Sequence, residues 1–245
     1  MPEASVQDVE AAVAAASAAQ PAWAALSPQE RGVPLKRMAE FVRKEKDELA
    51  RLDAISMGRP VNTFFDSHYA ATHFDYFAEA AYAQGHTSLN TPGFLNMSLR
   101  QPYGVVAIII PWNAPLVFFS KKVAPAVAAG NTVVLKSSEK APLTPWKLST
   151  WIKTCGFPPG VINVLSGHGQ TGNALALSMK VRCLSFTGST RTGRAIQIAS
   201  AKSNLKKVIF ELGGKGPAIV FGDADIEQST RETENSINWN SGQTW

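Results

Sequence analysis

Short apolar runs alternate with helical segments from residue 105 onward, and this alternation constrains the fold more than any other feature of the chain. The strongest run, Val105–Ile110, is stopped by Pro111. Strands separated by helices predict βαβ units and a mostly parallel sheet, and continuous apolar runs predict strands buried on both faces. The expected strands are Val105–Ile110, Thr132–Leu135, Val161–Leu165, Val181–Phe186, Lys207–Glu211 and Ala218–Phe221, and the expected helices lie near Leu116–Ala129, Thr144–Thr154, Thr171–Met179, Thr190–Ala201 and from Asp225 onward.

The first 85 residues show helical periodicity instead. Ser27 followed by Glu30 is a capping box, which predicts the start of a helix. The expected helices are Val6–Ala22, Leu35–Ile55 and Thr63–Tyr82. The chain is therefore predicted to be an α/β protein, with a Rossmann-like, mostly parallel sheet that is flanked by helices and preceded by an N-terminal helical segment.

Composition excludes several classes of protein. Hydrophobic residues make up 45% of the chain and charged residues 18%, an ordinary globular balance. The net charge of +5 is scattered rather than gathered into a stripe, so we expect no nucleic-acid partner. No apolar run is long enough to span a bilayer, so we expect no membrane partner. The two cysteines, Cys155 and Cys183, are too few and too far apart for a disulfide framework or a metal site, and we expect a cytoplasmic protein.

Polar residues follow the predicted strands, at the sheet edge where ligands of such folds bind. Gly188 and Ser189 lie between a strand and a helix, where free backbone amides can hold a phosphate. The alternative is that Ser189 only caps the helix. Asn113 follows the strongest strand and could donate its amide to a developing oxyanion, or it could be only a turn residue.

Two acidic residues also follow predicted strands. Glu139, with Lys136 three residues before it, could bind ribose hydroxyls, or the two could be an ordinary solvated ion pair. Glu211 precedes a pair of glycines that leave room for a water and a substrate, as a general base requires. Its alternative is a strand-end acid before a glycine turn.

Taken together, these segments resemble the NAD(P)-dependent aldehyde dehydrogenase superfamily. The matching segments are Pro111-Trp112-Asn113, Lys136-Ser137-Ser138-Glu139, Phe186-Thr187-Gly188-Ser189-Thr190, Glu211-Leu212-Gly213-Gly214-Lys215 and Asn240-Ser241-Gly242-Gln243. The resemblance covers essentially the whole chain. It implies an N-terminal helical segment, residues 1–85, packed on a dinucleotide-binding domain, residues 86–245. It also implies that the family's catalytic and oligomerisation domain is absent, so we do not expect the family's oligomer.

The resemblance assigns a role to each strand-end residue. It implies that Asn113 is the oxyanion-hole amide and Glu211 the general base, and that no metal takes part. The implied cofactor-binding residues are Trp112, Lys136, Glu139, Gly188, Ser189 and Gly213. A carboxylate at Glu139 would chelate the ribose hydroxyls and disfavour a 2′-phosphate, so NAD is expected rather than NADP.

The last residue, Trp245, stands where the family resemblance places the nucleophilic cysteine. The family's substrate is a small-molecule aldehyde, which the cysteine thiolate attacks before the glutamate activates water. Indole supplies no such nucleophile. We therefore expect a truncated chain that is inactive alone. The alternative is a non-catalytic remnant, or a regulatory or interaction module, that retains weak dinucleotide binding.

Overall fold

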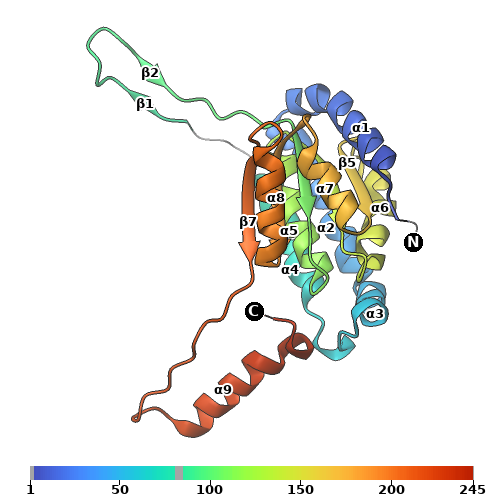
Figure 1. Ribbon diagram of the computed structural model, residues 1–245, viewed down its shortest axis with the longest axis vertical. Coiled ribbons are helices and arrows are strands. Elements are labelled where there is room, and N and C mark those ends of the chain that lie inside the picture. The colour runs from blue at the N-terminus through green and yellow to red at the C-terminus, as the bar shows by residue number, and fades with distance from the viewer. Residues whose placement is uncertain (1–2, 81–84, 245) are drawn as a thin grey trace.

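The computed structural model describes residues 3–80 and 85–244. Within them a parallel sheet has the strand order β5-β4-β3-β6-β7, and helices cover both of its faces (Figure 1). Every neighbouring pair in this sheet is parallel. Its strands are β3 (Val105–Ile109), β4 (Thr132–Ser137), β5 (Ile162–Ser166), β6 (Val181–Gly188) and β7 (Lys207–Leu212). The predicted α/β, Rossmann-like architecture is confirmed.

Alternation along the strands builds a core on each face of the sheet. In β3, Val106 and Ile108 face one core, and Ala107 and Ile109 face the other. The first core is covered by α5 (Pro115–Ala128) and α6 (Leu143–Cys155), and the second by α1 (Val6–Ala25), α7 (Gly169–Leu177) and α8 (Thr190–Ala201). Both β3 and β4 are buried along their whole length, as their continuous apolar sequences predict.

The N-terminal helices add a further layer outside α5 and α6. They are α2 (Pro28–Lys44), α3 (Lys46–Met57) and α4 (Asp66–Glu79), with a short 3-10 turn, η1 (Val61–Thr63), before the last. The Ser27 capping box is confirmed, since its hydroxyl accepts from the Glu30 N–H and the Glu30 carboxylate accepts from the Ser27 N–H.

The helical segment differs from its predicted elements between α2 and α3. The single helix predicted over Leu35–Ile55 is wrong, because Glu45 leaves helical geometry and the chain turns between α2 and α3. The turn lets α3 bury Leu49 and Leu52, and neither Gly nor Pro marks it in the sequence. The predicted end of the third helix, Tyr82, lies outside the described residues. The boundary between residues 85 and 86 stays a prediction.

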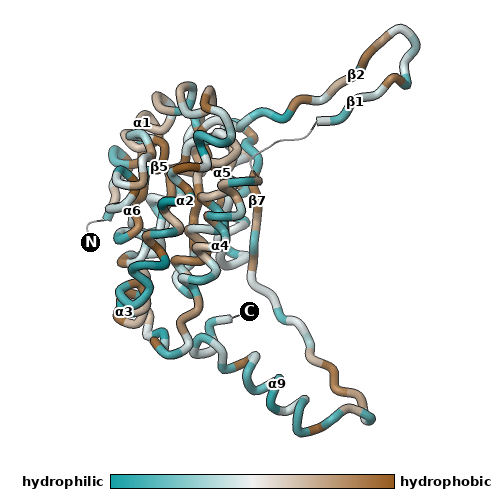
Figure 2. The backbone as a smooth tube through the Cα atoms, turned by 180° about the vertical axis from the view of Figure 1, so that it is seen from behind, coloured by the Kyte–Doolittle hydropathy of each residue, from teal (hydrophilic) through white to brown (hydrophobic). Residues whose placement is uncertain are grey.

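The strand predicted over Ala218–Phe221 is also wrong. After β7 the chain runs away from the sheet to α9 (Ile226–Asn238) and then to a second 3-10 turn, η2 (Trp239–Gly242) (Figure 1). A strand needs a neighbour to satisfy its backbone N–H and C=O groups, and this segment leaves the sheet edge. Its apolar residues Ile219, Val220 and Phe221 are exposed, and Figure 2 shows this hydrophobic stretch on the connector. The helix predicted from Asp225 is confirmed, with Asp225 as its N-cap.

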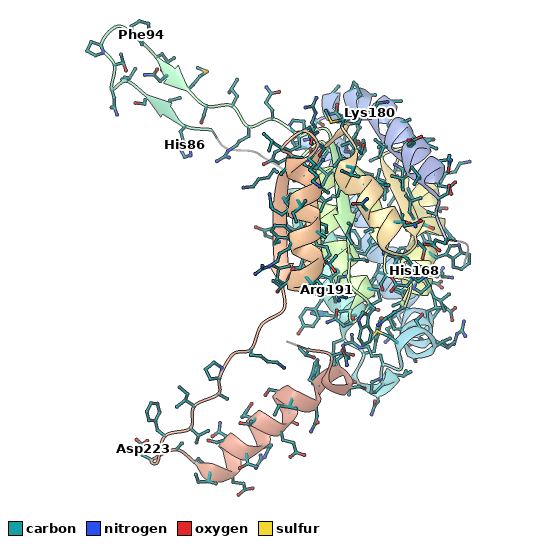
Figure 3. The ribbon with its side chains drawn as sticks, viewed as in Figure 1. His86, Phe94, His168, Lys180, Arg191 and Asp223 are labelled. Atoms are coloured by element: carbon teal, nitrogen blue, oxygen red, sulfur yellow. The ribbon has the colours of Figure 1, made fainter. Side chains whose placement is uncertain are left out.

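A two-stranded hairpin was not predicted. Antiparallel strands β1 (Thr87–Ser88) and β2 (Asn96–Met97) project from the body, with Phe94 near the tip and Asp223 marking the far end of the other extension (Figure 3). In the described ranges, no helix is both long and apolar enough to cross a membrane.

Candidate functional site

The strand order reverses direction between β3 and β6. The chain passes from β3 outward to β4 and β5, then returns to place β6 on the other side of β3. In open parallel sheets, ligands bind in the crevice beyond the carboxyl ends of the strands at such a switch point. Apart from Trp245, the predicted site residues lie at or just after the carboxyl ends of β3, β4, β6 and β7, so the parallel sheet brings them to this edge.

The loop from β6 into α8 carries the predicted phosphate site. Ser189 is the N-cap of α8, and its Oγ accepts a hydrogen bond from the Thr192 N–H at 3.3 Å. The capping interpretation is therefore correct in itself, and it leaves the helix N-terminus, with its partial positive charge, facing the sheet edge. A Cβ at Gly188 would lie 2.6 Å from Cζ of Phe186, so only glycine fits without displacing that ring. Arg191, in the first turn of α8, lies at the same end (Figure 3).

Lys136 and Glu139 come at the end of β4. Lys136 is buried, its Nζ donates to the Ser137 carbonyl oxygen at 3.0 Å, and the Nζ lies 3.8 Å from Oε2 of Glu139. Burial lowers the pKa of Lys136, while the Glu139 carboxylate opposes that shift. The pair is thus not the fully solvated one of the alternative interpretation: the ammonium is inside and the carboxylate remains accessible.

Trp112 lies beside Lys140, the residue that follows Glu139. Lys140 Nζ stands 5.5 Å from the centre of the Trp112 ring, a cation–π distance. Gly213, at the end of β7, is exposed, and no atom of the described residues other than its chain neighbours lies within 4 Å of a Cβ built there. The structure therefore gives no packing reason for glycine at that position.

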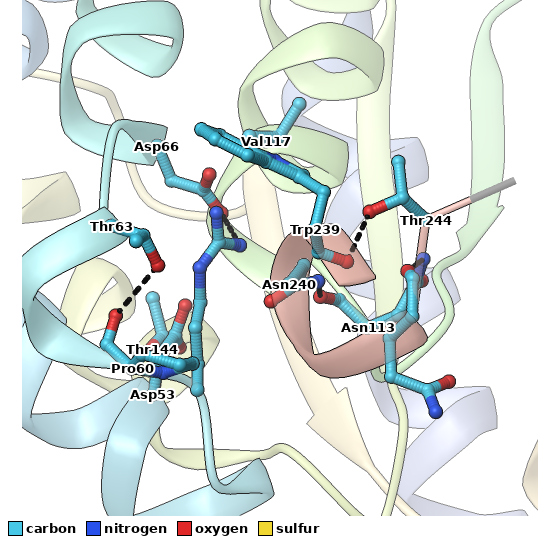
Figure 4. Close-up of polar contacts among 12 residues, drawn as sticks. Asp53, Pro60, Thr63, Asp66, Asn113, Val117, Thr144, Trp239, Asn240 and Thr244 are labelled. Atoms are coloured by element: carbon cyan, nitrogen blue, oxygen red, sulfur yellow. Dashed lines mark hydrogen bonds and ion pairs between the residues drawn. The ribbon is translucent and has the colours of Figure 1, made fainter. Parts of the chain in front are cut away.

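Asn113 contacts the last described residues of the chain. Its Nδ2 donates to the Gln243 carbonyl oxygen at 2.8 Å, and Asn240 Nδ2 donates to the Asn113 carbonyl oxygen at 2.8 Å (Figure 4). The turn that allows this has positive φ at Asn240, Ser241 and Gly242. The Asn113 side chain therefore acts as a donor here. Trp245, the residue predicted at the nucleophile position, lies outside the described residues.

Glu211, at the end of β7, is bound from several sides. Its Oε2 accepts from Thr187 Oγ1 at 3.1 Å, and its Oε1 accepts from Lys121 Nζ at 3.1 Å. Lys122 Nζ lies 3.8 Å from Oε2 and donates to Ser185 Oγ. Burial is the main cause that lowers the pKa of Lys122, and Glu211 partly offsets it. Register places Thr187 opposite Glu211 in the sheet.

Asn113 and Glu211 line the same cavity, of about 270 Å³. Several other residues that line it were not predicted from the sequence, namely Arg59, Asp66, Tyr69, Lys121 and Trp239. One signal could have found part of this wall. Val117 and Lys121 are four residues apart, which puts them on one face of α5, and Asn113 lies just before that helix.

The thiols lie away from this edge. Cys155 ends α6 and Cys183 lies within β6, and both are free and buried. Burial raises the pKa of Cys155 to about 11 and also raises that of Cys183. Within the described ranges, no group of three or more His, Cys, Asp or Glu residues could hold a metal ion.

A parallel α/β sheet with a helix N-terminus and a Lys–Glu pair at its carboxyl edge defines a Rossmann-like fold of the nucleotide-binding kind. The chain belongs to the aldehyde dehydrogenase family, whose model matches residues 1–244. An aldehyde dehydrogenase from Emericella nidulans is 44% identical over 98% of this chain and 49% of its own length. The chain spans about half the length of the curated relatives it matches.

Solved structures give the same result. PnpE in complex with nicotinamide adenine dinucleotide is 46% identical, with a TM-score of 0.95 over 99% of this chain and 50% of that chain. An E. coli NADP dependent enzyme is 38% identical, with a TM-score of 0.96 over 100% of this chain and 51% of that chain. Similar structures thus include proteins named for either dinucleotide.

Proposed function

We propose that this chain forms the coenzyme-binding part of an enzyme that oxidises an aldehyde to a carboxylic acid, with NAD⁺ as the hydride acceptor. The observation that carries the proposal is the cavity shared by an amide donor, Asn113, and a carboxylate, Glu211, at the carboxyl edge of the sheet. Aldehyde oxidation needs both groups. The amide stabilises the alkoxide that forms on the substrate carbonyl carbon, and the carboxylate activates the water that releases the acid.

The contacts of both residues suit these roles. Asn113 Nδ2 donates to a carbonyl oxygen of the chain itself, which is the interaction that a substrate oxygen would take over. Glu211 is tethered by Thr187 on the neighbouring strand, so its carboxylate is held at the sheet edge. Preorganised donors and acceptors of this kind contribute most when water is excluded around them.

The residues at the neighbouring strand ends fit a dinucleotide. The N-terminus of α8, with Gly188 and Ser189, would hold the pyrophosphate, and Glu139 with Lys136 would hold the adenosine ribose. Trp112 and Gly213 would lie on the nicotinamide side. The bound coenzyme supplies the acceptor for the hydride. The accessible carboxylate of Glu139 would repel a 2′-phosphate, which supports NAD rather than NADP.

We further propose that the 245 residues alone do not turn over an aldehyde. A thiolate must reach the carbonyl carbon, and both cysteines are buried thiols with raised pKa values. Position 245, where the family resemblance expects the nucleophile, is a tryptophan. The buried free thiols also support a reducing, cytoplasmic setting.

A second candidate function is a binding module that holds a dinucleotide without chemistry. It is favoured by the contacts of Asn113 and Glu211, because the first is engaged with the tail and the second with two lysines. In that case the chain would still bind a dinucleotide, while the cavity lined by Asn113 and Glu211 would bind no aldehyde.

Calorimetric titration of NAD and NADP into the purified chain tests the proposed cofactor site. We expect NAD to bind more tightly than NADP, and Glu139→Gln to weaken NAD about tenfold, since a hydrogen bond to a charged group contributes about 1.5–3 kcal/mol. Glu79→Gln is the matched control, because it removes another carboxylate that is paired with a lysine. Absence of NAD binding to the native chain would refute both candidate functions.

Aldehyde binding, rather than turnover by the chain alone, separates the two candidates. We expect no aldehyde-dependent NADH from the chain alone. Turnover above background that disappears in Glu211→Gln would contradict the proposed inactivity and would show that another group acts as the nucleophile. A catalytic role for the cavity predicts that an added aldehyde binds there. A module that only binds a dinucleotide does not predict aldehyde binding.

A further inference from the structure

The charges around Glu211 do not balance. Lys121 and Lys122 lie 3.1 Å and 3.8 Å from its two carboxylate oxygens, so two ammonium groups face one carboxylate. The Lys122 side chain is only 8% exposed and also donates to Ser185 Oγ, which directs it into the protein. The Lys121 side chain is 50% exposed and lines the cavity. Positive charge in excess of the Glu211 carboxylate is therefore presented to the cavity by Lys121.

The other charged pair on the cavity wall does not offer such a cation. Arg59 Nη1 donates to Asp66 Oδ2 at 2.7 Å, and both side chains are almost fully buried (Figure 4). The guanidinium charge is therefore neutralised within the wall. The field of Lys121 reaches other groups as well: after burial, it is the second cause that lowers the pKa of His73 on α4.

Apolar side chains adjoin Lys121 on the same helical face. Ala114, Val117 and Phe118 line the cavity together with Asn113, and Lys121 lies over the Phe118 ring at 5.8 Å. A neutral aldehyde in this space would cover the ammonium group with hydrocarbon and remove it from water without a new partner, which is costly. A ligand anion would supply that partner through a charge-assisted hydrogen bond.

We propose that the aldehyde accepted by this cavity carries a carboxylate, and that Lys121 is the residue that selects it. This inference rests on the proposed function, since it assigns the substrate class of the same cavity. Asn113 would hold the aldehyde oxygen, and the substrate carboxylate would lie toward Lys121, which lines the same cavity from α5. The cavity volume of about 270 Å³ has room for a small aldehyde of this kind.

The test compares two aldehydes that differ in charge. The probes are 4-oxobutanoate and its uncharged methyl ester, titrated into the 245-residue chain with NAD present, with dissociation constants taken from ligand-detected NMR. We expect the acid to bind about tenfold more tightly than the ester. Lys121→Met should bring the ratio of the two constants to about one, while Lys121→Arg should preserve the preference. The ratio is used because it cancels any change that the substitution causes at Glu211.

Lys36→Met is the matched control. The Lys36 side chain is 53% exposed and pairs with a single carboxylate, Glu79, at 2.8 Å, much as Lys121 pairs with Glu211, but it does not line the cavity. It should leave the acid-to-ester ratio unchanged. The inference is overturned if native protein binds the two probes equally, if it binds neither, or if Lys121→Met keeps the preference.

The same samples separate this inference from the proposed function. If NAD binds and the two aldehydes bind equally, the substrate class is wrong while the dinucleotide site stands. If NAD does not bind, the proposed function fails, whatever the ratio. A thermal unfolding curve of Lys121→Met identifies a variant that fails to fold, and Lys121→Arg then decides the outcome: loss of the preference in that charge-preserving variant contradicts the inference.

Discussion

Asp53 is a buried acid whose ionisation should make the stability of this protein depend on pH. It lies on α3, fully buried, and one carboxylate oxygen accepts from Thr144 Oγ1 (Figure 4). Among the described residues, the other oxygen has no hydrogen-bond partner. Burial raises the pKa of Asp53 to about 7; the Thr144 hydrogen bond and Arg59 oppose this effect and Asp66 adds to it.

The sign follows from proton binding. The unfolded chain loses the Asp53 proton near the ordinary carboxyl pKa of 3.8, whereas the folded protein keeps it until about pH 7. Between these values the folded state binds more protons, so the free energy of unfolding falls as pH rises. The slope is about 1.4 kcal/mol per pH unit, which gives a total loss of about 4 kcal/mol across the interval.

Asp53→Asn should remove this loss because an amide cannot ionise. The measurement is urea unfolding followed by tryptophan fluorescence at several pH values from 4 to 8. We expect the variant to match the native protein at the acid end and to exceed its stability by up to about 4 kcal/mol at pH 8. Asp47→Asn, an exposed acid on the same helix, is the control. If Asp53→Asn keeps the native slope, Asp53 is already ionised in the folded protein and the reasoning is refuted.

Three further predictions concern packing, backbone geometry and the tail. Trp23 is buried, and its Nε1 donates to the Val127 carbonyl oxygen at 2.9 Å. Trp23→Ala should therefore lower the free energy of unfolding, measured with urea, by about 3–5 kcal/mol. A loss below about 1 kcal/mol would contradict the place of Trp23 in the core. Gly160 has φ +87°, and a Cβ there would lie 2.6 Å from the Ala15 carbonyl oxygen, whereas Gly58 has φ +76° and no atom outside its immediate chain neighbours within 4 Å of an added Cβ. Gly160→Ala should therefore lower the free energy of unfolding more than Gly58→Ala does. Equal losses of stability would refute the clash at Gly160. Asn240→Ala removes the hydrogen bond to the Asn113 carbonyl oxygen and should speed hydrogen exchange of the Gln243 amide, while the exchange of sheet amides stays unchanged. Unchanged exchange at Gln243 would show that other contacts hold residues 240–243 in place.

Local pattern predicted the central elements well. The runs that became β3 and β4 are buried along their whole length, as a continuous apolar run in the middle of a parallel sheet should be. The Ser27 capping box predicted a helix start because its two hydrogen bonds are local. Ala218–Phe221 has a similar apolar composition and was predicted incorrectly, because strand formation also requires a neighbour that local sequence does not supply.

The candidate site divides in the same way. Asn113 and Glu211 could be predicted because each follows a strand of a parallel sheet, and all such ends meet at one edge. Arg59, Tyr69 and Trp239 could not, since their segments lie far from Asn113 in the sequence and reach the cavity only through packing.

The amino-acid sequence by itself determined the type and order of the main elements and the edge at which polar residues gather, because periodicity, capping and strand ends are local properties. Only the tertiary structure decided which charges share a space. Lys121 reaches Glu211 of β7 because α5 packs on the sheet over β3 and β4, and Asp53 is buried because α3 turns away from α2 and packs against Thr144 of α6. Both outcomes depend on distances between segments far apart in the chain, and no local pattern encodes them.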